Sequence, residues 1–133
     1  MTGIDLVRCP GLAAVPYAYG ATVPAGARLV FLAGACPLDG DGRTVHVGDV
    51  AGQAGAAVAN LRAVLAAVGA QLTDVVSTRV LVATTRRADL GTAWDVVSGA
   101  FGAHDVPSTL LGVTVLGWPG QLVEVEAVAL VPG

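Results

Sequence analysis

The sequence predicts a single α+β domain in which two helices pack on one face of a mixed β-sheet. Three observations carry this prediction. The hydrophobic periodicity gives the element order ββαβαββ, the last ten residues of the pattern alternate strictly as in a strand, and two segments have the apolar spacing of amphipathic helices. A length of 133 residues fits one domain, so residues 1–133 are interpreted as one unit without repeat or linker.

The composition indicates that this domain does not stand alone. It is 54% hydrophobic and only 13% charged, whereas the surface of a small soluble monomer normally carries about 25–35% charged residues. In addition, two helices can cover only one face of a sheet. Both arguments predict that other subunits cover the second face.

Charge and residue types exclude several classes of function. All seven basic residues are arginine and the net charge is −3, so nucleic-acid binding, a lysine Schiff base and a P-loop are not expected. Apolar runs break before the roughly 18–20 residues of a membrane span. Cys9, Cys36, His46 and His104 lack the spacing of a zinc site, so no metal is expected. Met1–Pro10 does not resemble a signal peptide, and the cytoplasm is the expected compartment.

The first half of the chain reads as two strands and a helix. Residues 1–14 carry no periodic signal and are expected to cross the surface. Strands are predicted over 15–23 and 28–33, joined as a hairpin by the turn residues 24–26. Asp49 is a good helix N-cap and Gly69 a good C-terminal stop. One helix face between them is apolar: Val50, Ala54, Val58, Leu61, Leu65 and Val68.

The second half begins with a strand over 75–82. Its alternation predicts one face made of Val76, Thr78, Val80 and Val82, and another made of Val75, Ser77, Arg79 and Leu81. A helix follows, marked by Leu90, Trp94, Val97 and Phe101, with Gly102 as its stop. Strands over 108–116 and 122–131 complete the chain.

The last strand carries the most informative pattern. Glu124 and Glu126 point to the same side, about 7 Å apart along the strand, and Leu122, Val128 and Leu130 share that side. A face that is apolar at its ends and acidic in its middle predicts a cavity or an interface. The alternative is a solvated edge with two ordinary surface glutamates.

Several short motifs occur in a characteristic order along residues 15–131, and the motif in the last strand is the strongest of them. Together they resemble the RidA/YjgF family, also called the Rid or reactive-intermediate deaminase family. The residues that carry the resemblance are Pro16-Tyr17, Gly34 with Pro37, Asp49-Val50-Ala51-Gly52-Gln53, Asn60-Leu61, Gly69, Asp74-Val75-Val76, Phe101-Gly102, Pro107-Ser108-Thr109 and Val123-Glu124-Val125-Glu126-Ala127.

The resemblance implies a chorismate-mutase-like fold that assembles as a homotrimer. In the family, three sheets form a closed barrel with helices outside and ligand clefts between subunits. Water hydrolyses enamines and imines such as 2-aminoacrylate there, giving a 2-keto acid and ammonia without a cofactor or metal. By position, Glu124 matches the glutamate that activates water, and Glu126 matches a second glutamate of less defined role. Gly34 matches a backbone donor, while Tyr17 and Thr109 match residues that line the cleft.

The chain also departs from the family pattern. Pro107 stands where active deaminases carry an arginine that binds the substrate carboxylate, a contact of roughly 1.5–3 kcal/mol. Trp94 replaces a frequent Asn, and Ala33 and Ala35 replace Ser and Gln. The resemblance with these changes predicts a hydrolase acting on a larger, less anionic imine or enamine than the small 2-imino acids.

Several alternatives stay open on the sequence alone. Arg79 either faces the cleft and compensates for Pro107, or pairs with Glu124 or Glu126. Trp94 is either packing or a wall for a ligand, and Tyr17 either lines the pocket or only closes the hairpin. The alternative function is a non-catalytic trimer that binds a metabolite or partner protein. A ribonuclease is a third possibility, against which the acidic charge argues.

Overall fold

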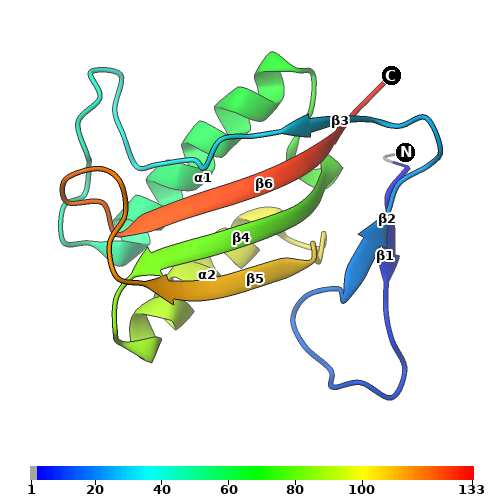
Figure 1. Cartoon of the computed structure of the whole chain (residues 1–133), viewed down its shortest axis with the longest axis horizontal. Coiled ribbons are helices and arrows are strands. Elements are labelled where there is room, and N and C mark those ends of the chain that lie inside the picture. Colours follow the sequence, from blue (N-terminus) through cyan, green and yellow to red (C-terminus); the bar gives the residue numbers. More distant parts are fainter. Residues whose placement is uncertain (1–2) are drawn as a thin grey trace.

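A computed structural model describes residues 3–133, and Met1 and Thr2 lie outside it. Its main sheet has four strands in the order β3-β6-β4-β5, and both helices lie on one face of it (Figure 1). β3 and β4 run antiparallel to β6, while β4 and β5 are parallel. The predicted α+β class is therefore confirmed. The bounds of these elements are β3 Arg28–Phe31, α1 Val50–Ala67, β4 Val75–Ala83, α2 Arg87–Phe101, β5 Ser108–Val113 and β6 Val123–Val131, with a 3-10 turn at Leu72–Asp74.

The first helix begins and ends where its capping residues predict. The Asp49 carboxylate accepts a hydrogen bond of 2.9 Å from the Gly52 amide at the N-terminus of α1. At the other end Gly69 has φ +76°, and the amides of Gly69 and Ala70 bond to the carbonyls of Ala66 and Leu65. These two bonds form a Schellman motif, which satisfies the last carbonyls of the helix.

Helix α1 is also the one helix among the described residues that could cross a membrane by length and composition, with 18 residues of mean hydropathy 1.2. It packs against β6 and α2 instead. Its side chains Ala54, Ala57, Leu61 and Leu65 are almost fully buried in the core. This is the ordinary behaviour of a core helix, and it gives no compelling membrane span.

The predicted hairpin of 15–23 with 28–33 is wrong. Residues 20–22 form β2 (Gly20–Thr22), which pairs antiparallel with β1 (Asp5–Val7), inside the segment expected to be irregular. The pair lies to one side of the main sheet (Figure 1). β3 pairs instead with β6, which offers it four register partners from Val128 to Val131. The three residues of β2 carry no bulky apolar side chain, so their pattern does not assign them to the buried face of the main sheet.

The predicted faces of the third strand need one correction. Thr78, Val80 and Val82 are buried under the helices, and Arg79 is exposed on the other face, as expected. Val75 was expected beside Arg79, yet it is completely buried in the core. A β-bulge between Val75 and Ser77 inserts one residue and reverses the alternation before it.

The last two strands are slightly shorter than predicted. β5 ends at Val113 and not at residue 116, because its partner β4 ends at Ala83, opposite Val113. β6 begins at Val123, one residue after the predicted start.

The two faces of the sheet differ in cover. Val123, Val125, Ala127 and Ala129 of β6 are buried against the helices, as the alternation predicts. Among residues 3–133, no helix covers the opposite face, which is turned to the viewer in Figure 1. We call this side the open face. Besides Glu124, Glu126 and Arg79, it carries Phe31 of β3, which is 75% exposed, and its register partner Val128.

Candidate functional site

Glu124 lies on the open face near the start of β6, half-buried, where two side chains bind its carboxylate. The Cys36 thiol lies 3.1 Å from Oε1, and the amide Nε2 of Gln121 donates to the same oxygen at 3.3 Å. The second oxygen, Oε2, receives no side-chain bond of this kind among the described residues. One edge of the carboxylate is thus held, and the other is available.

Gly34 gives this carboxylate its place. A Cβ atom built on Gly34 would lie 2.6 Å from both Cδ and Oε2 of Glu124. Any side chain at position 34 would therefore displace the carboxylate. Gly34 is needed here because another group comes close to its backbone, which is a common reason for glycine outside turns.

Two side chains of α1 support the part of the site around Glu124. Gln53, fully buried, accepts a 2.6 Å bond from the Leu122 amide and donates to the Gly120 carbonyl at 2.9 Å, which fixes the entry to β6. Asn60 donates to the carbonyls of Cys36 and Leu38 at 2.7 and 3.0 Å. Gln53 and Asn60 therefore position the two segments that meet at Glu124.

An apolar pocket of about 310 Å³ lies beside these residues, between α1 and the segment that follows β3. Gly34 and Cys36 line it together with Leu38, Val64 and Trp118. Trp118 is 48% exposed, so the pocket reaches the surface at this residue. We call Glu124, Gly34, Cys36, Gln121 and this pocket the carboxylate half of the site.

The environment of Cys36 favours its protonated form. Burial first, and then the hydrogen bond to the Glu124 carboxylate and its negative charge, raise the pKa of the thiol from 9.0 to about 11. At neutral pH the thiol is therefore a donor to Glu124.

A second group of predicted residues meets at the β5 edge of the sheet. The rings of Tyr17 and Trp94 lie edge to face with centroids 6.1 Å apart. They line a pocket of about 490 Å³ with Pro16, Ser108, Thr109 and Leu110. We call these residues the aromatic half of the site. Tyr17 does not close a hairpin, since the predicted hairpin does not exist.

Arg79 lies between the two halves and pairs with an acid. Its guanidinium is 3.4 Å from Glu126 Oε1, with both side chains partly exposed. Of the two alternatives for Arg79, the ion pair is the one observed. Register places Arg79 opposite Glu126 on one side and opposite Thr109 on the other.

Pro107 precedes β5 and offers only its carbonyl, which accepts a 3.0 Å bond from the Thr78 amide. Among the described residues that line the aromatic pocket, none is charged. The position where the family carries an arginine thus adds no cation to the aromatic half.

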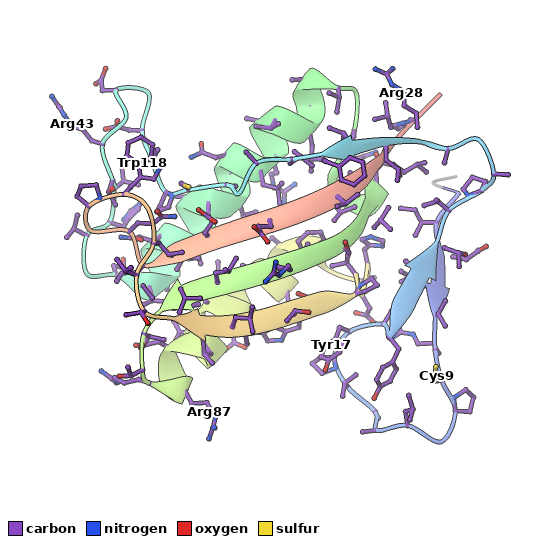
Figure 2. All side chains as sticks on the ribbon, in the orientation of Figure 1. Cys9, Tyr17, Arg28, Arg43, Arg87 and Trp118 are labelled. Carbon is purple, nitrogen blue, oxygen red and sulfur yellow. The ribbon has the colours of Figure 1, made fainter. Side chains whose placement is uncertain are left out.

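The two halves are separated within one chain. Glu124 is opposite Leu81, while Thr109 is opposite Arg79 and two strands away from β6. Two strand spacings and two residues along the strand correspond to about 12 Å between Cα atoms. Figure 2 shows Tyr17 and Trp118 at opposite ends of the sheet.

Sequence reasoning missed Cys36 and Gln121 as contacts of Glu124. Cys36 follows Gly34 by two residues in an extended segment, so a shared face for these two was readable from spacing. The contact with β6 was not, because it depends on the bridge between Ala35 and Val125, which are 90 positions apart.

Comparison with known proteins places this chain and its fold in a family. The family model described as Endoribonuclease L-PSP matches residues 12–131. The chain belongs to this family. It is the same family as that of the Rid and YjgF proteins, so the resemblance read from the sequence is confirmed. No curated protein matches the chain in sequence.

Solved structures agree with the family assignment. The Rid-family protein YyfB of Yersinia pestis is 26% identical with a TM-score of 0.89, over 96% of this chain and 98% of that one. Rv2704 of Mycobacterium tuberculosis, described as a member of the YjgF/YER057c/UK114 family, is 32% identical with a TM-score of 0.64, over 96% and 99%. RidA of an Antarctic Psychrobacter shares the fold at 20% identity, with a TM-score of 0.68 over 95% and 98%.

Proposed function

We propose that this Rid-family chain hydrolyses an apolar imine or enamine with water activated by Glu124. The observation that carries the proposal is the geometry of that carboxylate. Cys36 and Gln121 hold Oε1, while Oε2 lies over Gly34, and Gly34 and Cys36 also line an apolar pocket. A held carboxylate with one free oxygen has the form required of a general base.

The proposed active unit is a homotrimer whose three sheets close into a barrel. The open face supports it, since Phe31 is 75% exposed there beside its register partner Val128, and no helix of the described part of the chain lies over this face. Burying exposed apolar side chains of this kind favours association at about 25 cal/mol per Å². The low charge content of the sequence supports the same conclusion.

The proposed cleft combines the carboxylate half of one subunit with the aromatic half of its neighbour. Within one chain the two halves are about 12 Å apart, too far for both to contact the reacting atoms of a small ligand. Rotation about the barrel axis would bring the β3 side of one sheet, next to which Glu124 lies, against the β5 side of the next, which carries Thr109. Each trimer would then hold three equivalent clefts.

The chemistry needs only acid–base catalysis. The imine reacts as its protonated form, the iminium ion. Glu124 Oε2 takes a proton from water as the water oxygen bonds to the iminium carbon and the C=N π electrons move to nitrogen. Glu124 then returns this proton to the carbinolamine nitrogen, the C–N bond breaks with its electron pair leaving on the amine, and the hydroxyl proton passes to Glu124 and from there to solvent, which gives the carbonyl. An enamine enters the same path after protonation at carbon. No electron is transferred to an external acceptor.

The substrate class follows from the aromatic half. Tyr17, Trp94 and Pro16 line its pocket, and none of the lining residues can bind a carboxylate as an ion pair. We therefore assign the chain to imines with an apolar or aromatic substituent and without a carboxylate on the imine carbon. The two free cysteines support the cytoplasm as the compartment.

The test is turnover of imines made in place. A flavin amine oxidase acting on an arylalkylamine supplies a carboxylate-free imine, and an amino-acid oxidase acting on alanine supplies a small 2-imino acid. We expect this chain to accelerate ammonia release from the first more than from the second. Glu124→Gln should reduce the rate by about 10²–10⁴-fold, the usual contribution of a general base.

Asp41→Asn is the matched control, because it removes one carboxylate from an exposed loop. It should leave the rate unchanged. An unchanged rate in Glu124→Gln would remove this residue from the mechanism. No acceleration with any imine, together with ligand binding, would favour the non-catalytic trimer. Cleavage of RNA by the wild type but not by Glu124→Gln would favour the ribonuclease.

A further inference from the structure

The segment that follows β3 brings a thiol to the candidate base. Residues 32–36 run alongside the start of β6, where Ala35 forms a bridge with Val125 through backbone bonds of 2.7 and 3.0 Å. Asn60 holds the carbonyl of Cys36 at 2.7 Å. The position of Cys36 is therefore fixed by backbone contacts on both sides.

Two acceptors lie within reach of this thiol. Glu124 Oε1 is 3.1 Å from Sγ and the Gly34 carbonyl oxygen is 3.4 Å away. The carboxylate is the closer of the two and carries the charge, which makes it the stronger acceptor. Gln121 Nε2 donates to the same oxygen and also to the Val123 carbonyl at 3.1 Å, so its amide is fixed as well.

We propose that Cys36 is a positioning residue for Glu124: its thiol, together with Gln121, holds Oε1 so that Oε2 over Gly34 is the oxygen that meets water. The catalytic purpose of this arrangement rests on the proposed function. Without the thiol, the carboxylate would be held by Gln121 alone and would turn about its last side-chain bond. A misplacement of about 1 Å at a reacting group can cost about 10²-fold in rate.

The thiol itself reports on the contact without any turnover. Burial and Glu124 raise the pKa of Cys36 to about 11, and only the thiolate is alkylated. Near pH 8 we therefore expect Cys36 to react about 100-fold more slowly than an ordinary thiol. Glu124→Gln removes the charge but leaves the burial in place. We therefore expect it to raise the alkylation rate of Cys36 by about three- to tenfold.

The experiment measures iodoacetamide alkylation of the full-length chain at pH 8 in a Cys9→Ser background, so that Cys36 alone reports. Glu126→Gln is the matched control, since it neutralises the other acid of the same strand face, which pairs with Arg79. We expect faster alkylation in Glu124→Gln and an unchanged rate in Glu126→Gln. Equal rates in Glu124→Gln and in the background would overturn the contact.

Turnover tests the positioning role. Cys36→Ala should lower kcat by about three- to thirtyfold with little change in KM, and Cys36→Ser, which keeps a donor, should recover most of the loss. A kcat of Cys36→Ala equal to the wild type would overturn the role. If the wild type turned over no imine, the proposed function would fail, and the alkylation rates would still decide whether Cys36 holds Glu124.

Discussion

The two halves of the site are built in different ways. In the carboxylate half, Glu124 is placed by a chain of hydrogen bonds that leads through Cys36 to Asn60 of α1, while Gln53 fixes the entry to its strand. In the aromatic half, Tyr17 and Trp94 meet through ring contacts alone, one on a loop and the other on a helix. Hydrogen bonds place the functional group of the first half, whereas ring packing places the aromatic pair of the second, beside one hydrogen bond of 2.7 Å from Thr78 to Ser108.

This difference predicts how readily each half accepts substitutions. Hydrogen-bonded groups tolerate little substitution, because an unsatisfied buried partner costs about 1–3 kcal/mol. Packed apolar walls exchange side chains at lower cost. The departures from the family pattern at Pro107 and Trp94 fall in or beside the aromatic half, while those at Ala33 and Ala35 flank Gly34 in the carboxylate half.

The largest expected effect comes from a substitution that disturbs the carboxylate half alone. Gly34→Ala places a Cβ 2.6 Å from Cδ and Oε2 of Glu124. The carboxylate is the end of a flexible side chain, so it moves aside and the fold is kept. We expect imine turnover to fall by about 10²-fold, with a thermal unfolding midpoint within a few degrees of the wild type.

Gly40→Ala is the control, since a Cβ at Gly40 meets nothing within 4 Å. It should leave both turnover and unfolding unchanged. Full turnover in Gly34→Ala would show that the position of Oε2 does not matter.

A substitution beside the aromatic half should have an intermediate effect and test its specificity. Pro107→Arg adds a guanidinium near the pocket of Tyr17, Trp94 and Thr109. An arginine–carboxylate pair of about 1.5–3 kcal/mol corresponds to about ten- to hundredfold, so we expect kcat/KM for small 2-imino acids to rise by that factor. Pro107→Ala removes the ring without adding charge and should bring no gain. A gain in kcat/KM in Pro107→Ala would show that loss of the proline ring, and not the added charge, causes the increase.

The smallest effect concerns stability at high pH. Because the pKa of Cys36 is raised from 9.0 to about 11, the neutral thiol contributes stability that is fully present below pH 9. That contribution is lost as pH rises toward 11, since the unfolded chain ionises first. We expect the urea midpoint of the wild type to fall more steeply over this range than that of Cys36→Ala. Parallel curves would contradict the raised pKa.

Local signals predicted much of this structure. Asp49 and Gly69 marked the ends of α1, and the alternation in β6 assigned Glu124 and Glu126 to one face. What failed depended on contacts between distant residues. Hydrophobic periodicity could not predict the pairing of β2 with β1, the bulge after Val75 or the contact of Cys36 with Glu124.

The same limit applies to the candidate site. Sequence motifs nominated Glu124, Gly34, Tyr17, Trp94 and Thr109 as candidate residues. Spacing could not tell that they form two groups about 12 Å apart. That division appears only once the strand register is known.

Subunit mixing tests the two-chain cleft most directly. Glu124→Gln loses the base and Thr109→Trp fills the aromatic pocket, so each variant alone should be inactive. When the two are unfolded and refolded together in equal amounts, random assembly should restore about a quarter of the wild-type activity per cleft. Native mass spectrometry would verify mixed trimers of three 13.2 kDa chains. Mixed trimers without activity, or a stable active single chain, would contradict the account.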